Sequence, residues 1–127
     1  FFFEASSFVQ WEKHLETLDN RLEIHAGIPG PASLKTLVYY ATSCGISNSI
    51  RFLSKQAFNI AKFATTRTPD KLIADLADYK NNKPSSKLSK LHFFPFGGIK
   101  KTSKWLNLIS NNPLDINSIN EFRAIID

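Results

Sequence analysis

Few residues of the sequence have the types and spacing that catalysis or metal binding requires. The three histidines, His14, His25 and His92, have no metal-ligand spacing, and no paired-carboxylate, Ser/His/Asp or Cys/His arrangement is evident. His25 and His92 fall within predicted strands, where packing or hydrogen bonding is favoured over catalysis. Cys44 is the single cysteine, which excludes an internal disulfide and favours a reducing cytosol; we expect it to be a small apolar residue at a helix end.

Positive charge is concentrated between Asp78 and Asp115, where the chain has seven lysines and no acidic residue; its net charge is +5. Such a stretch can be a solvated surface, a site for the anionic tail of a substrate or a nucleic-acid contact. We favour the solvated surface and expect no nucleic-acid partner, because no zinc-finger, helix-turn-helix or RNA-binding signature accompanies the lysines.

Two segments are predicted to be short apolar strands that end in Gly/Pro turns and lead into helices. Residues 22–26 precede the turn 27–31, and residues 91–96 precede Gly97-Gly98, while residues 1–3 are predicted to end a third strand. This strand-turn-helix order is typical of parallel α/β proteins. Each turn could present backbone N–H groups to an anion, but neither is a GxGxxG motif or a P-loop, so a tight connection is favoured. We expect packing roles for Phe93, Phe94, Phe96 and Trp105.

Capping signals and apolar periodicity predict the helices between these strands. Ser6 or Ser7 is expected to cap the first helix, Pro31 to open the second, and Gly45 to end it in a left-handed conformation. Thr68-Pro69-Asp70 is expected to start a later helix. Residues 80–90 read as a loop, and further helices are predicted for residues 48–64, after Gly98, and within 114–127.

The length of 127 residues suits one modest core. No apolar run approaches the roughly 20 residues of a membrane span, so we expect a soluble protein with no membrane contact. The chain has no methionine and begins in what reads as a strand end, and we expect it to be the C-terminal piece of a larger protein. Three strand-helix units are only part of an eight-stranded barrel of about 250 residues.

The segments FFFEASSFVQW, EIHAGIPGPASLKTLVYYATSCGISNSIRFLSKQ and HFFPFGGIKKTSKWLN, in this order, resemble the C-terminal part of the methylenetetrahydrofolate reductase family. The resemblance covers residues 1–108, is specific in the strand-turn segments and is loose over 57–90. It implies that residues 1–127 form the C-terminal part of a TIM (β/α)8 barrel, with residues 1–3, 22–26 and 91–96 as the sixth, seventh and eighth strands.

Family members pass a hydride from NADH or NADPH through FAD to methylenetetrahydrofolate. Because the family's FAD contacts and catalytic carboxylates lie on earlier strands, the resemblance implies no catalytic or cofactor-binding residue here. A folate-contacting glutamine of the family aligns with Ser54, and Gln56 is a possible substitute; a contacting arginine aligns with Gly98. Positive charge for the folate carboxylates would come from one of four residues, namely Lys100, Lys101, Arg51 or Lys55.

The resemblance therefore implies a cytoplasmic enzyme, a flavin-dependent methylenetetrahydrofolate reductase of which this chain alone is inactive. Its partners would be methylenetetrahydrofolate and NAD(P)H, and the whole protein could be a homo-oligomer. The altered turn PFGG leaves a second interpretation open, a non-catalytic folate-binding or partner subunit related to this reductase.

Overall fold

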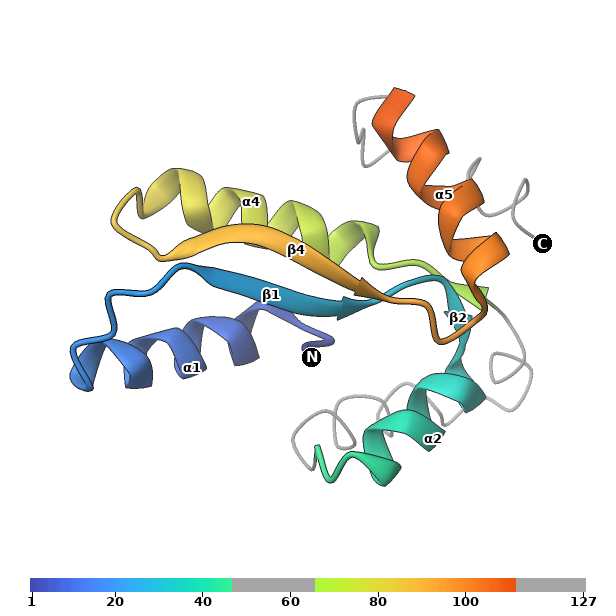
Figure 1. Cartoon of the computed structure of the whole chain (residues 1–127), viewed down its shortest axis with the longest axis horizontal. Coiled ribbons are helices and arrows are strands. Elements are labelled where there is room, and N and C mark those ends of the chain that lie inside the picture. The colour runs from blue at the N-terminus through green and yellow to red at the C-terminus, as the bar shows by residue number, and fades with distance from the viewer. Residues whose placement is uncertain (47–65, 112–127) are drawn as a thin grey trace.

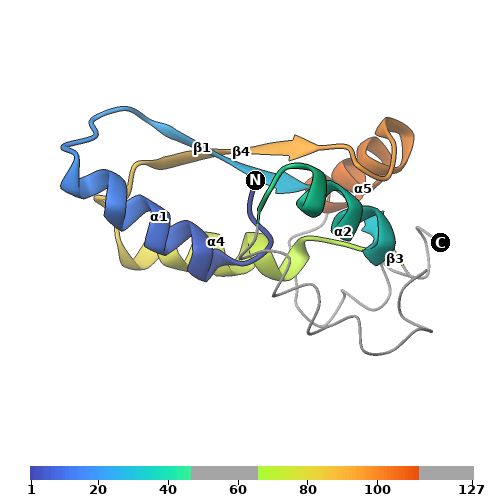
Figure 2. The same cartoon turned by 90° about the horizontal axis from the view of Figure 1, so that it is seen from below.

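The computed structural model describes residues 1–46 and 66–111. Two strands, β1 (Ile24–Pro29) and β4 (Leu88–Phe94), pair in parallel, and the helices α1 (Ala5–Thr17) and α4 (Asp70–Asn82) lie side by side beneath one face of the pair (Figure 2). The prediction of an α/β protein with parallel strands is thus confirmed. The other described elements are β2 (Ala32–Ser33), α2 (Leu34–Ser43), β3 (Thr66–Arg67) and α5 (Ile99–Asn111).

The main core lies between the strand pair and the two helices beneath it. Along β1, alternate residues are buried, because successive side chains of a strand point to opposite faces: Ile24, Ala26 and Ile28 are buried, whereas His25 is exposed. These residues pack with Phe8 of α1 and with three leucines of α4 and β4, Leu72, Leu76 and Leu88. Burial of this apolar surface positions α1 and α4 against the sheet.

The opposite face of the strand pair is not covered by any helix of the described residues (Figure 2). The register shows which residues lie on this face. It pairs His25 with Lys90, His92 with Gly27, and Phe94 with Pro29. Parallel sheets usually have both faces covered. The two strands therefore have a covered face and an uncovered face.

Residues 1–3 are not a strand in the structure, but they run beside one. The backbone N–H of Phe2 donates a 2.8 Å hydrogen bond to the carbonyl of Gly27, whereas Ile24 and Gly30 donate theirs toward the β4 side. In a parallel pair, alternate residues direct their backbone groups to opposite sides. The spatial order is consequently residues 1–3, β1, β4, which is the order predicted from the sequence.

The strand boundaries differ from the predicted ones. β1 begins at Ile24 and continues to Pro29, past the predicted end at residue 26, and Leu22 lies outside it. Gly27 lies within the strand. A Cβ at this position would lie 2.7 Å from the ring of Phe94, so the strand needs a glycine there. β4 spans Leu88–Phe94, and the predicted loop 80–90 shrinks to residues 83–87, since α4 continues to Asn82.

Two predicted helix starts are wrong. α1 begins at Ala5, so Ser6 and Ser7 lie inside the helix rather than capping it. Pro31 does not open α2, because the short β2 intervenes and pairs antiparallel with β3; the side chain of Ser33 caps α2 by accepting from the N–H of Thr36 at 3.2 Å.

Two other boundary predictions are confirmed. Gly45 has φ +67° after α2 and donates to the carbonyl of Thr42, and Ile46 donates to that of Ala41. A helix starts at the predicted segment, because α4 begins at Asp70; however, Pro69 is its N-cap rather than its first residue, and no side chain caps it. The helices predicted for 48–64 and 114–127 lie outside the described residues. Within 1–46 and 66–111, no helix has the length and apolar character needed to cross a membrane.

Candidate functional site

The turns that follow β1 and β4 lie against each other at the carboxyl ends of the strands (Figure 1). The N–H of Gly30 donates to the carbonyl of Phe94 at 2.8 Å. A Cβ at Gly97 would lie 2.0 Å from the carbonyl oxygen of Pro31, and one at Gly30 would lie 2.7 Å from the hydroxyl of Thr102. These close backbone approaches explain the glycines, as expected for tight connections, and they fix where the strand ends point.

Gly98, one of the predicted substrate-binding positions, is exposed and has φ +101°. Its N–H donates to the carbonyl of Pro95 at 2.9 Å, and its own carbonyl accepts from the N–H and the hydroxyl of Thr102 as α5 begins. A side chain would be strained at this φ. The backbone of this turn thus favours glycine over the arginine with which the resemblance aligns it.

Lys100 and Lys101 lie in the first turn of α5, beside Gly98. Lys100 is exposed, whereas Lys101 is half-buried and donates to the hydroxyl of Thr66 at 3.0 Å, which connects α5 to β3. The structure therefore brings Gly98 and Lys100 together. The other predicted contacts, Arg51, Ser54, Lys55 and Gln56, lie outside the described residues.

A row of rings runs from the uncovered face of β4 past the strand ends to α2. We define the aromatic row as His92, Phe94, Phe96 and Tyr40, with Phe1 beside it. The centroids of Phe94 and Phe96 are 5.6 Å apart with planes 17° from parallel, and Phe96 and Tyr40 are 4.3 Å apart at 15°. His92 contacts Phe94 at 4.8 Å and Phe1 contacts Phe96 at 5.0 Å. Such contacts hold the rings in fixed orientations.

The sequence prediction grouped Phe93, Phe94, Phe96 and Trp105 as packing residues, and the structure divides them. Phe93 lies against the main core and meets the buried Trp105 of α5 at 5.4 Å, as predicted. Phe94 and Phe96 belong to the aromatic row, and Phe96 also packs against a second buried cluster of β2 and α2, as predicted. Tyr40 was not identified from the sequence, because only the fold brings α2 beside the end of β4.

The remaining chemistry-bearing residues are scattered. His14 is exposed on α1, and His25 is exposed on the uncovered face, while Cys44 is exposed directly after α2. The lysines do not form one patch, because β4 separates two groups of them. One group precedes this strand (Lys80, Lys83 and Lys87), and the other follows it in α5 (Lys100 and Lys101). In the described ranges, no group of three or more His, Cys, Asp or Glu side chains could hold a metal ion.

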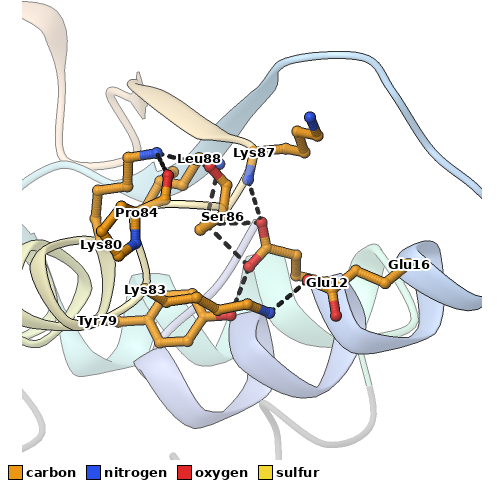
Figure 3. A network of polar contacts seen from close by, with 9 residues as sticks. All are labelled: Glu12, Glu16, Tyr79, Lys80, Lys83, Pro84, Ser86, Lys87 and Leu88. Atoms are coloured by element: carbon orange, nitrogen blue, oxygen red, sulfur yellow. Dashed lines mark hydrogen bonds and ion pairs between the residues drawn. The ribbon is translucent and has the colours of Figure 1, made fainter.

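At the opposite end of the strands, where β4 begins, Glu12 forms a buried polar network (Figure 3). Its carboxylate accepts from the hydroxyls of Tyr79 at 2.6 Å and Ser86 at 2.7 Å, and from the N–H of Lys87 at 2.7 Å. The sequence contained a signal for it, since Glu12 follows Phe8 by four residues and shares its buried helix face. The network connects α1, α4 and the loop before β4, so it holds these segments together.

Burial acts on the pKa of the Glu12 carboxyl in the upward direction, but the hydrogen bonds from Tyr79, Ser86 and Lys87 outweigh it and lower the pKa. Burial and the hydrogen bond to Glu12 raise the pKa of Tyr79. The charged carboxylate is thus the form that the fold stabilises.

The sequence matches no protein-family model.

Proposed function

We propose that this chain forms one wall of a (β/α)8 barrel that reduces methylenetetrahydrofolate to methyltetrahydrofolate, with a nicotinamide nucleotide as hydride donor and FAD as carrier. The order of the three strand-turn segments supports the proposal, since it resembles that of methylenetetrahydrofolate reductases. The parallel pairing of β1 with β4 is compatible with consecutive strands of such a barrel; β4 is followed by α5, and β1 by the short β2 and then α2.

The observation that supports this proposal most directly is the position of the aromatic row. It lies at the carboxyl ends of two parallel strands, the end at which barrel enzymes build their active sites. Phe94, Phe96 and Tyr40 have nearly parallel rings. Flat rings such as a pterin or an isoalloxazine gain both apolar burial and stacking against such a surface. The row would therefore present a ring-binding wall to the ligand.

The uncovered face of β1 and β4 supports the same proposal. In a closed barrel the helices cover the outer face, and the inner face packs against side chains from the other strands. Phe94, His92 and Phe1 would then face the barrel interior, and α1 and α4 would lie outside, as they do here (Figure 2).

The fit of the described residues to FAD is limited to this ring surface. When bound, FAD would accept a hydride and pass it on, and the remainder of the barrel would supply its main contacts. The residues of this chain would orient the folate ring and exclude water from it. Lys100, exposed beside the turn, would meet the carboxylates of the folate tail.

A second candidate function is a non-catalytic folate-binding or partner subunit related to these reductases. The observation that favours it is Gly98, whose φ of +101° suits a glycine. The arginine with which the family contacts the folate is absent at this position. The two candidates differ in one property, since the reductase carries a flavin and the partner subunit does not.

The proposal is tested on the complete protein that contains this chain, by its visible absorption spectrum and by its oxidation of reduced nicotinamide nucleotides with methylenetetrahydrofolate. Replacing Phe96 with Leu should raise the KM for the folate about threefold to tenfold, because stacking of one ring is lost. The control is Leu22→Ala, since Leu22 is 76% exposed and lies outside the aromatic row. A protein that binds folate without flavin would favour the partner subunit, and binding of neither would overturn both.

A further inference from the structure

A cavity of about 410 Å³ lies beyond the carboxyl end of β1, among the first turns of α1, α2 and α4. Most of its wall is apolar and comes from six residues, Phe3, Pro29, Leu34, Leu37, Pro69 and Leu72. Its size and lining are those of sites that bind small organic molecules. Neither the aromatic row nor the Glu12 network contributes to this wall.

Arg67 of β3 lines this cavity, and its side chain is incompletely paired. The Nε atom is buried and has no hydrogen-bond partner, which is unusual because a buried donor without an acceptor destabilises the fold. None of the ion pairs found among the described residues includes Arg67. Because the covered Nε exposes almost no surface, a ligand in the cavity would pair with the other N–H groups of the guanidinium.

The other charged groups of the wall already have partners. Lys71 and Asp75 form an ion pair at 2.7 Å, and a carboxylate oxygen of Glu4 accepts from the hydroxyl of Ser7 at 3.1 Å. Glu4 is the one acidic group here that is not paired with a cation in the described structure. The guanidinium of Arg67 is therefore the group best suited to attract a ligand.

The first turns of two helices also contribute to this wall, and each has a carboxylate beside it, Glu4 before α1 and Asp70 in α4. Ala5 and Ser6 of α1, and Lys71 of α4, contribute to its wall from the first turns of their helices. The N-cap residues of these helices, Glu4 and Pro69, make no side-chain capping hydrogen bond. The first backbone N–H groups of a helix have no partner within the helix, and its dipole favours an anion there.

We propose that this cavity binds a small carboxylate with an apolar body. The guanidinium of Arg67 pairs with the carboxylate, and the body lies against the leucine, proline and phenylalanine side chains. A carboxylate is favoured over a highly charged phosphate because the wall is mostly apolar and already contains Glu4 and Asp75. This site is separate from the proposed folate site, and its occupancy requires no flavin.

The test is a titration of the purified protein with hexanoate, followed by NMR or calorimetry, and a parallel titration with hexanamide, which has the same body without the charge. We expect saturable binding of hexanoate and at least tenfold weaker binding of hexanamide. Equal binding of the two compounds, or no saturable binding of hexanoate, overturns the proposal. Because flavin and nicotinamide are absent from this assay, its result is independent of the reductase proposal.

Three variants locate the site. Arg67→Gln should weaken hexanoate binding about tenfold, whereas Arg21→Gln, at an exposed arginine outside the cavity, should leave it unchanged. Glu4→Gln keeps an acceptor for Ser7 and removes a negative charge from the wall, so it should tighten hexanoate binding. Unchanged affinity in both Arg67→Gln and Glu4→Gln, with circular dichroism matching that of the parent protein, excludes this cavity. Should Arg67→Gln fail to fold, Glu4→Gln decides alone.

Discussion

The hydroxyl of Tyr79 donates a 2.6 Å hydrogen bond to the carboxylate of Glu12, and this bond joins α4 to α1 beneath the start of β4. Ser86 and Lys87 complete the coordination of the same carboxylate from the loop before β4. One buried side chain thus joins α1 to α4 and to the loop before β4, which lie 67 to 75 residues later in the sequence (Figure 3). Its contribution to stability can be measured directly.

Replacing Glu12 with Gln should lower the free energy of unfolding by about 2–4 kcal/mol, because the amide presents a donor where three donors already converge. The control is Glu16→Gln on the same helix, where the ion pair to Lys83 is partly exposed and the loss should stay below about 1 kcal/mol. Urea denaturation of both variants measures the difference. Equal losses would show that the network contributes nothing beyond a surface ion pair.

The pH dependence of stability should follow from Glu12. Its pKa is lower in the folded protein than in the unfolded chain, so the unfolded chain binds a proton first as the pH falls. The contribution of Glu12 to stability is fully present above the unfolded pKa and is lost as the pH falls through the folded pKa. Thermal unfolding from neutral pH downward measures this loss, and Glu12→Gln should show a smaller acid-induced decrease. A parallel decrease in both proteins would contradict the assignment.

Gly97 should tolerate no side chain, although it lies at the surface. A Cβ there would meet the carbonyl of Pro31 at 2.0 Å, so Gly97→Ala should separate the two turns and destabilise the protein by about 2–4 kcal/mol. Gly45→Ala is the matched control, since it has a positive φ but open space around it, and its cost should be about 1 kcal/mol. Denaturant midpoints that rank the two variants in the opposite order would exclude the close contact.

Asp70 connects α4 to α5 through a buried hydrogen bond. Its buried carboxylate accepts from the indole N–H of Trp105 at 3.2 Å and from the hydroxyl of Thr68. Asp70→Ala leaves the indole N–H unpaired and should cost about 2–3 kcal/mol, whereas Asp78→Ala on the exposed side of the same helix should cost less than about 0.5 kcal/mol. Chemical denaturation measures both costs. A red shift of tryptophan emission in Asp70→Ala would accompany exposure of Trp105.

The sequence predicted the fold where local signals agreed with tertiary packing. The end of α2 at Gly45, a helix start within residues 68–70 and the burial of Trp105 follow from local signals and periodicity, and the structure confirms them. The strand ends did not follow, because Gly27 reads as a turn residue but lies within β1 under the ring of Phe94. Local propensity carries no information on such a neighbour.

The candidate site was predictable only in part, for the same reason. Gly98 and Lys100 lie two residues apart in the sequence; the resemblance aligned Gly98 with a folate contact, and Lys100 was chosen for its positive charge. Tyr40 and Phe96 are distant in the sequence, and their 4.3 Å stack exists only because α2 folds back beside the end of β4. Arg67 likewise belongs to no motif that the sequence reveals, and its unpaired Nε becomes evident only in the folded structure.

The pairing of β1 with β4 has a consequence for how the protein reaches its fold. Ile24 pairs with Leu88, so the chain between them must close a long loop before the parallel ladder gains any hydrogen bond. Contacts between residues so distant in the sequence slow folding. During synthesis β1 emerges well before β4. The apolar residues of β1 and Phe8 of α1 stay exposed until β4 has been made. The nascent chain is thus expected to fold late and to depend on chaperones that protect β1 until β4 is complete.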